Sequence, residues 1–283
     1  MVTPSEYLRA LAARVVEPFP AIATLLAGSA AHGTSDEWSD IDVVLFYDSW
    51  PGASALERAR ESLGGSEYVL LGGTADGDVL LEQFRVDGVA CQLVHQTEAA
   101  WRVASAGVLE RFEAASPVQK ALSGLHEGIV LRGVEFVEAR RSEAAYPEGL
   151  RAAMVESGLD VFPLWRMQDA LSRRDAELWQ RGELAAGLQK VLAMLAGVNR
   201  VYFSTFQLKH ARQLVASFRH APEDLAARID GALRAPTMGY AADELERLVD
   251  ETLTIVEREL PDVDLARLRR HVGARLDPWT MSE

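Results

Sequence analysis

The chain has 283 residues, of which 48% are hydrophobic and 25% are charged, and its formal net charge is −13. This composition is typical of a globular protein, and the length corresponds to one large or two medium domains. The sequence has no apolar run of the roughly 18–20 residues that span a membrane, and no apolar signal core near its start. Its single cysteine, Cys91, excludes an internal disulfide and a cysteine-based metal cluster.

We therefore expect a cytoplasmic protein with no membrane association. The acidic charge argues against a nucleic-acid partner, because phosphate backbones are repelled by a negative protein. It suits cationic partners instead, including divalent metals.

Helical and strand patterns alternate at the start of the chain. Leu8, Leu11, Val15 and Val16 recur at helical spacing, and residues 22–27 then form a short apolar run typical of a strand.

Further along, a strand, a helix and another strand are expected. Residues 41–47 are rich in β-branched and aromatic side chains and predict a strong strand. Residues 54–63 have a helical pattern that ends at Gly64-Gly65, and residues 68–71 predict another short strand.

A β-hairpin is expected next. Residues 79–86 and 89–96 both resemble strands, and Asp87-Gly88 lies between them. An Asp-Gly pair between two such runs is a strong hairpin signal.

After about residue 116 the chain becomes rich in Ala, Leu, Arg and Glu, and no strand pattern is evident. We therefore expect an α+β fold with a boundary near Ser116-Pro117: a catalytic domain over residues 1–115, built on a mixed β-sheet flanked by helices, and an α-helical bundle over residues 116–283. The predicted helical segments are residues 146–174, 176–214, 222–234 and 241–259.

Two carboxylates precede the predicted strand at residues 41–47. Side chains alternate along a strand, so Asp40 and Asp42 share one face, with Cβ atoms roughly 6.6 Å apart. Val44 and Phe46 continue that face. Two carboxylates on one face are suited to a hard divalent ion such as Mg²⁺, which would offset the cost of placing charge beside apolar residues. The alternative is a surface turn in which both aspartates are solvated.

The turn at Gly28-Ser29 follows the first predicted strand. Glycine allows close approach to the backbone, and the Ser29 hydroxyl with the N–H groups of a helix start can hold a phosphate. Gly28-Ser29, ten residues, and then Asp40-Ile41-Asp42 together resemble the signature of the polymerase-β-like nucleotidyltransferase superfamily.

In layout the sequence is most similar to antibiotic nucleotidyltransferases of the aminoglycoside and lincosamide type. The resemblance covers residues 20–96 firmly and the helical half more loosely. It implies that Asp40 and Asp42 bind Mg²⁺, and that Gly28, Ser29 and Ser39 bind a nucleoside triphosphate, with ATP favoured.

The superfamily usually has a third acidic residue on a neighbouring strand. A two-residue turn at Asp87-Gly88 pairs Gln83 with Gln92 and places Gln92 at that position, on the more polar face of the hairpin. Glutamine offers a carbonyl oxygen to a metal, but it cannot ionise and is a poor base. Other residues considered for the base are Glu82, which a one-residue bulge would turn to this face, and His95, Asp87, Glu127 and Glu148.

The stretch from Asn199 to His210 combines basic and aromatic residues. The resemblance suggests that Tyr202 and Lys209 contact the triphosphate, with Arg200 behind them. The alternative is that Tyr202 lies in the core with Phe203 and Phe206, while the basic residues are solvated. A further candidate for the nucleotide site is His32, for which solvent exposure is the alternative.

Three functions remain open at this stage. The first is Mg²⁺-dependent transfer of a nucleoside monophosphate, AMP in the favoured case, to a hydroxyl of a small molecule such as an aminoglycoside- or lincosamide-like antibiotic. The second is modification of a protein or an RNA. The third, suggested by Gln92, is a nucleotide-binding protein with little or no turnover.

Overall fold

The computed structural model describes residues 2–74 and 77–279 and forms two compact units. The first unit is Met1–Gly107 with Ala121–Ala145, and the second is Val108–Lys120 with Tyr146–Glu283. The boundary expected between residues 115 and 116 falls inside the segment 108–120, after which the chain returns to the first unit.

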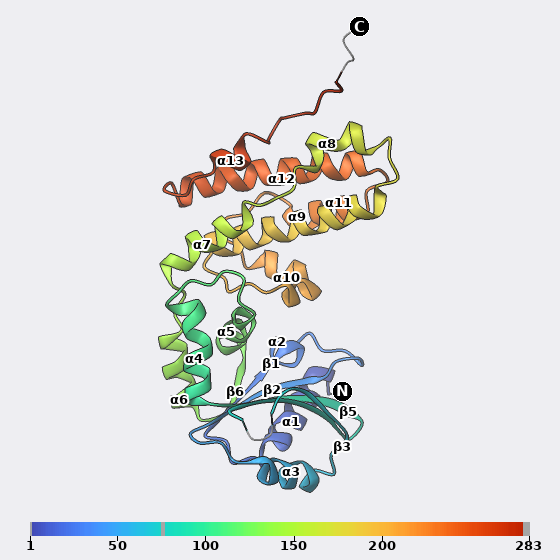
Figure 1. Cartoon of the computed structure of the whole chain (residues 1–283). Coiled ribbons are helices and arrows are strands. Elements are labelled where there is room, and N and C mark those ends of the chain that lie inside the picture. The colour runs from blue at the N-terminus through green and yellow to red at the C-terminus, as the bar shows by residue number, and fades with distance from the viewer. Residues whose placement is uncertain (1, 75–76, 280–283) are drawn as a thin grey trace. The chain divides into compact units, whose positions relative to one another are not determined.

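The first unit is built on a mixed six-stranded sheet with the order β3-β4-β5-β2-β1-β6 (Figure 1). Only β2 and β5 are paired in parallel, and every other neighbouring pair is antiparallel. The strands are β1 (Ala23–Ala27), β2 (Ile41–Tyr47), β3 (Ser66–Gly73), β4 (Val79–Val86), β5 (Val89–Thr97) and β6 (Ile129–Arg132). The expected α+β class is confirmed.

The hairpin of β4 and β5 has the register that its Asp-Gly turn predicts. Val86 pairs with Val89, and Gln83 pairs with Gln92, with no bulge between the two strands. Both turn residues have positive φ, +51° at Asp87 and +80° at Gly88, as a tight two-residue hairpin requires.

The expectation that residues after 116 contain no strand is wrong, because residues 129–132 form strand β6. It pairs antiparallel with β1 and forms the edge of the sheet. With four residues between Gly128 and Gly133 and helices on both sides, it is too short for alternation to reveal it. Its strand character depends on pairing with β1.

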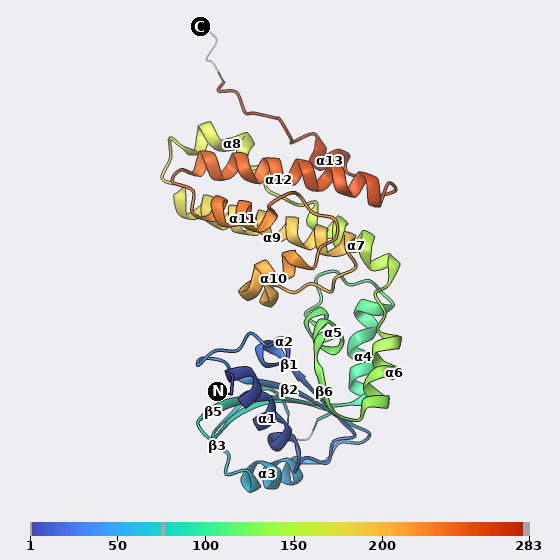
Figure 2. The ribbon, with the colours of Figure 1, turned by 180° about the vertical axis from the view of Figure 1, so that it is seen from behind.

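One face of the sheet packs on α1 (Pro4–Val16) and α3 (Ala53–Ser62), which lie on the same side of it in Figures 1 and 2. The predicted helical stripe of α1 is buried there. Contacts come from alternate residues of β2, namely Ile41, Val43, Leu45 and Tyr47, and from Leu80, Phe84, Cys91 and Leu93 of the hairpin. Burial raises the pKa of the Cys91 thiol to about 11, which leaves it a neutral core residue.

A buried charge lies on this packed face. The Glu82 side chain is fully buried, and the Arg60 guanidinium donates to it at 2.7 Å. His95 Nε2 lies 3.1 Å from the other Glu82 oxygen, and His95 Nδ1 lies 2.8 Å from the Tyr47 hydroxyl. Burial, with Glu82 nearby, raises the pKa of Tyr47. This network offsets the cost of burying the Glu82 carboxylate.

The opposite face is covered at one end by α4 (Glu98–Leu109) and α6 (Val134–Glu143). Phe46 at the end of β2 packs against Trp101 and Phe136, with ring centroids 5.9 Å and 5.4 Å apart. At the other end of β2, Asp42 and Val44 on the same face are only half-buried. The face therefore has an apolar end and a polar end.

The second unit is helical. Its long helices α9 (Glu177–Val198) and α12 (Met238–Glu259) pack together. Among the described residues of the whole chain, no helix is long and apolar enough to cross a membrane. The other helical segments of the chain are α2 (Gly28–His32), α5 (Val118–Glu127), α7 (Glu148–Gly158), α8 (Leu164–Leu171), η1 (Thr205–His210), α10 (Ala211–Ala216), α11 (Leu225–Leu233) and α13 (Ala266–Arg269).

The continuous helix expected over residues 176–214 is interrupted after Val198. Arg200 has a φ of +57°, which breaks the helix. The Asn199 side chain accounts for the break, because its amide nitrogen donates to the Leu195 and His220 carbonyls while its oxygen accepts from the Arg219 and His220 N–H groups. Only the bond to Leu195 is local, whereas the other three reach residues 20 or 21 positions away, so the helix break depends on a tertiary contact.

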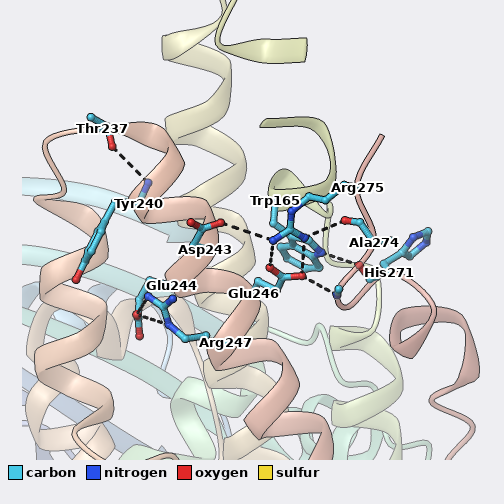
Figure 3. Close-up of polar contacts among 11 residues, drawn as sticks. Trp165, Thr237, Tyr240, Asp243, Glu244, Glu246, Arg247, His271, Ala274 and Arg275 are labelled. Atoms are coloured by element: carbon cyan, nitrogen blue, oxygen red, sulfur yellow. Dashed lines mark hydrogen bonds and ion pairs between the residues drawn. The ribbon is translucent and has the colours of Figure 1, made fainter. Parts of the chain in front are cut away.

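The end of the second unit is held by polar contacts, shown in Figure 3. The indole Nε1 of the fully buried Trp165 donates to the His271 carbonyl at 2.7 Å. Glu246 on α12 accepts from the Gly273 N–H at 2.7 Å and from the Arg275 guanidinium at 2.8 Å. The chain that follows α13 is thereby anchored to α8 and α12.

Replacing Arg60 by alanine should destabilise the first unit by about 3 kcal/mol, because it leaves the Glu82 carboxylate buried without its cation. Urea unfolding followed by fluorescence measures the loss. The matched control is Arg58→Ala, an exposed residue on the same helix, which should change stability by less than about 0.5 kcal/mol. Equal effects of the two substitutions would contradict this assignment.

Candidate active site

Three chain segments meet at the polar end of β2. Ala27, which precedes Gly28, pairs with Asp42 on one side, and Asp42 pairs with Gln92 on the other. All three positions are half-buried. The glycine turn, the second aspartate and the glutamine of the neighbouring strand are therefore adjacent across the sheet.

Gly28 lies so close to Asp42 that a side chain at this position would displace the carboxylate. Its φ is +67°, and a Cβ atom built on it would lie 2.3 Å from Asp42 Oδ2. A side chain would be both strained and in collision with the carboxylate. The requirement for glycine at this position therefore comes from the contact between the turn and the acidic residue.

Asp40 and Gln92 are directly hydrogen bonded. The Gln92 amide Nε2 donates to Asp40 Oδ2 at 2.6 Å. A neutral amide therefore stands against the acidic pair where a third carboxylate was expected from the resemblance. The described residues contain no group of three or more His, Cys, Asp or Glu side chains placed to hold a metal ion.

Other parts of the first unit fix the short helix α2, on which Ser29 lies. The Arg9 guanidinium of α1 donates to the Ala30 carbonyl at 2.7 Å and to the Ala31 carbonyl at 2.9 Å. These bonds satisfy carbonyl groups at the end of the helix. Ser35 Oγ lies 3.3 Å from Ser29 Oγ and donates to it, which leaves the Ser29 proton available to a ligand.

The loop before Asp40 forms a closed turn. Ser39 Oγ donates to Asp36 Oδ1 at 2.9 Å and accepts from the Asp36 N–H at 3.0 Å. The Ser39 hydrogen bond, with one from the Trp38 N–H, holds the pKa of Asp36 below its usual range. The structure thus places Ser39 in a local turn immediately before the acidic pair, and its expected contact with a nucleotide stays a prediction.

The His32 ring links Glu127 to Gly28. His32 Nδ1 lies 2.8 Å from the Gly28 carbonyl oxygen, and its Nε2 lies 2.8 Å from Glu127 Oε2. Ser123 Oγ donates to Glu127 Oε1 at 2.7 Å. Glu127 is therefore joined to the glycine turn through His32.

The remaining candidates for a base are placed elsewhere. Glu82 and His95 lie on the packed face of the sheet, opposite to Asp42. Asp87 is at the hairpin tip, paired with Arg14. In the second unit, Glu148 is paired with Arg200 at 2.5 Å, and this contact lowers the pKa of Glu148.

The residues from the stretch 199–210 belong to the second unit. Tyr202 is buried, with its ring 4.9 Å from that of Tyr146, and Phe203 is buried as well. Phe206 is 57% exposed, so the alternative that all three aromatic residues are core is wrong for this residue. Lys209 is exposed, with its Nζ 5.9 Å from the Phe206 ring.

Sequence reasoning missed Arg9 and Ser35, which support α2. Arg9 borders the apolar stripe of α1, and a basic residue in that place was the available signal. Its carbonyl partners lie 21 and 22 residues away and follow only from the packing of α1 on α2.

Residues 8–71 match the family model described as a nucleotidyltransferase domain. No curated protein matches the sequence significantly. Among solved structures, the chain is similar to a nucleotidyltransferase-like protein from Exiguobacterium sibiricum 255-15, with 15% identity, 99% of this chain and 83% of that chain covered, and a TM-score of 0.31.

Replacing Gly28 by alanine should displace the Asp42 carboxylate and abolish metal-dependent nucleotide binding. The matched control is Gly33→Ala, which also has a positive φ of +74° but whose Cβ meets only an Arg9 nitrogen at 3.5 Å. Both variants should lose about 1 kcal/mol through backbone strain, and only Gly28→Ala should lose binding in titration calorimetry. Retained binding in Gly28→Ala would contradict the assigned contact.

Proposed function

We propose that the protein transfers a nucleoside monophosphate from a nucleoside triphosphate, in the favoured case AMP from ATP, to a hydroxyl group of a small molecule. The observation that carries the proposal is the position of Asp42, which lies within residues 8–71 that match a nucleotidyltransferase domain, between the Gly28 turn and Gln92. This arrangement puts the glycine turn directly beside the acidic pair.

The donor atoms at the site suit a hard divalent cation. Asp40 and Asp42 offer carboxylate oxygens, and Gln92 offers a carbonyl oxygen after a flip of its amide. Mg²⁺ typically takes one or two carboxylates and completes its shell with water and substrate phosphates, so a cluster of three acidic residues is not needed. When bound, such an ion would supply charge stabilisation to the phosphoryl group being transferred.

The residues around Gly28 would bind and orient the triphosphate. Gly28 has no side chain to obstruct approach to the backbone, and the Ser29 hydroxyl donates to a phosphate oxygen while accepting from Ser35. Ser39, in the turn immediately before the acidic pair, is proposed as a further nucleotide contact. Tyr202 and Lys209 belong to the second unit, and their contact with a nucleotide stays a prediction from the resemblance.

In the proposed reaction, the acceptor oxygen attacks the α-phosphorus, the bond to the β-phosphate oxygen breaks, and pyrophosphate leaves. The acceptor proton passes to solvent, because Gln92 cannot take it. General-base help is typically worth about 10²–10⁴-fold, so we expect turnover that is slow for a transferase and driven by positioning and charge neutralisation.

The acceptor is proposed to be a small cationic molecule with a free hydroxyl, such as an aminoglycoside- or lincosamide-like antibiotic. A net charge of −13 favours association with cations over anionic polymers.

A second candidate function is nucleotide binding without turnover. It is favoured by the hydrogen bond from Gln92 to Asp40, which satisfies that carboxylate without any metal.

Incubation with Mg²⁺, ATP and a panel of amino sugars and lincosamides should release pyrophosphate. Asp42→Asn should lower the rate by at least about 100-fold, because it removes the central carboxylate of the site. Glu57→Gln, an exposed carboxylate on α3, is the matched control and should keep full activity. Tight ATP binding with no pyrophosphate release from any acceptor would favour the second candidate.

Replacing Gln92 by glutamate should make the stability of the protein depend on divalent metal. Three carboxylates would then meet without the amide donor of Gln92, so the melting temperature should fall in chelator and recover in excess Mg²⁺. The wild-type protein should show a smaller metal-dependent shift. A variant that melts at the same temperature in both buffers would argue against metal binding at this position.

A further inference from the structure

A histidine-carboxylate pair beside the glycine turn has no part in the reaction described above. His32 is the last residue of α2, and Glu127 is the last residue of α5, 95 residues later in the chain. Both belong to the first unit. The His32 ring lies between the Gly28 carbonyl and the Glu127 carboxylate: its Nδ1 is 2.8 Å from the carbonyl oxygen, and its Nε2 is 2.8 Å from a carboxylate oxygen.

Both partners of the His32 ring are hydrogen-bond acceptors. A backbone carbonyl oxygen and a carboxylate oxygen each need a donor, and His32 offers one at each ring nitrogen when the ring is doubly protonated and positively charged. Glu127 in turn accepts from two donors, His32 and Ser123.

The pair lies where an anionic ligand would arrive. The carbonyl that His32 contacts belongs to Gly28, the residue in contact with Asp42, and the next residue carries the Ser29 hydroxyl. Glu127 is only one imidazole ring away from this turn. Without a neutralising partner, the negative charge of Glu127 would repel a triphosphate bound at this turn, and added salt would screen that repulsion.

We propose that His32 is a positioning residue for the triphosphate: its imidazolium neutralises Glu127 and holds the Gly28 carbonyl, so that the turn accepts an anionic ligand. The inference rests on the proposed function, because it takes a nucleoside triphosphate as the ligand. In this proposal, the positive charge of His32 is needed for triphosphate binding because Glu127 places a negative charge beside the turn.

The test is titration calorimetry of the full chain with a non-hydrolysable ATP analogue and Mg²⁺. His32→Ala should weaken binding about tenfold, because it leaves Glu127 uncompensated. Glu127→Gln alone should bind as well as the wild-type protein or better. The double variant His32→Ala with Glu127→Gln should recover most of the lost affinity, and the defect of His32→Ala should shrink as salt is raised.

Two comparisons separate charge neutralisation from a purely structural link between α2 and α5. His32→Arg keeps a cation and several donors and should bind like the wild-type protein. If the pair served only to join the two helices, the double variant would bind no better than His32→Ala. That outcome, or full affinity in His32→Ala, overturns the inference while leaving the proposed function standing.

Thermal melting of each variant shows whether weak binding is caused by unfolding. If His32→Ala does not fold, the comparison of His32→Arg with His32→Gln replaces it, and equal affinity in these two variants overturns the inference. If the wild-type protein binds no nucleotide analogue, the proposed function falls and this inference falls with it, which is a different result from loss confined to the variants.

Discussion

The parallel pairing of β2 with β5 is the constraint on which the site depends. It sets Asp42 beside Gln92, while the antiparallel neighbour β1 ends beside the same residue at Ala27. A shift of one residue in either register would turn Asp42 toward the packed face, because side chains alternate along a strand. The buried residues of β2 hold that register, since Ile41 and Val43 must stay in the core. Packing on one face of the sheet therefore positions the chemistry on the other.

The two faces treat negative charge in different ways. On the packed face, Glu82 is fully buried and is paired with Arg60 and His95, so residues of the protein itself compensate its charge. On the open face, Asp40 has an amide donor from Gln92 and no cation partner among the described residues. The first arrangement stabilises a fold, whereas the second leaves capacity for a cation from outside. This contrast is the physical basis for assigning one acidic group to structure and the other to ligand binding.

Much of the first unit could be predicted because its signals are local. The Asp87-Gly88 turn fixes the hairpin register, and the alternation of residues 41–47 fixes which side each aspartate takes. The contacts that complete the site are not local: Arg9 reaches α2 from another helix, and Glu127 reaches His32 across 95 residues. Strand β6 could not be recognised for a related reason, since four residues become a strand only by pairing with β1. The break after Val198 depends equally on Asn199 finding partners near residue 220.

The chain order also sets the sequence of events during synthesis. Strand β1 is made early, at residues 23–27, but its outer neighbour β6 is made only at residues 129–132, after a segment that belongs to the second unit. Until then the outer backbone groups of β1 have no strand beside them, and an open strand edge invites pairing with other chains. A nascent polypeptide cut off near residue 115 would therefore carry every residue of the Gly28–Asp42–Gln92 arrangement and still leave its sheet unfinished. A pause in synthesis within this interval would leave that edge of β1 open.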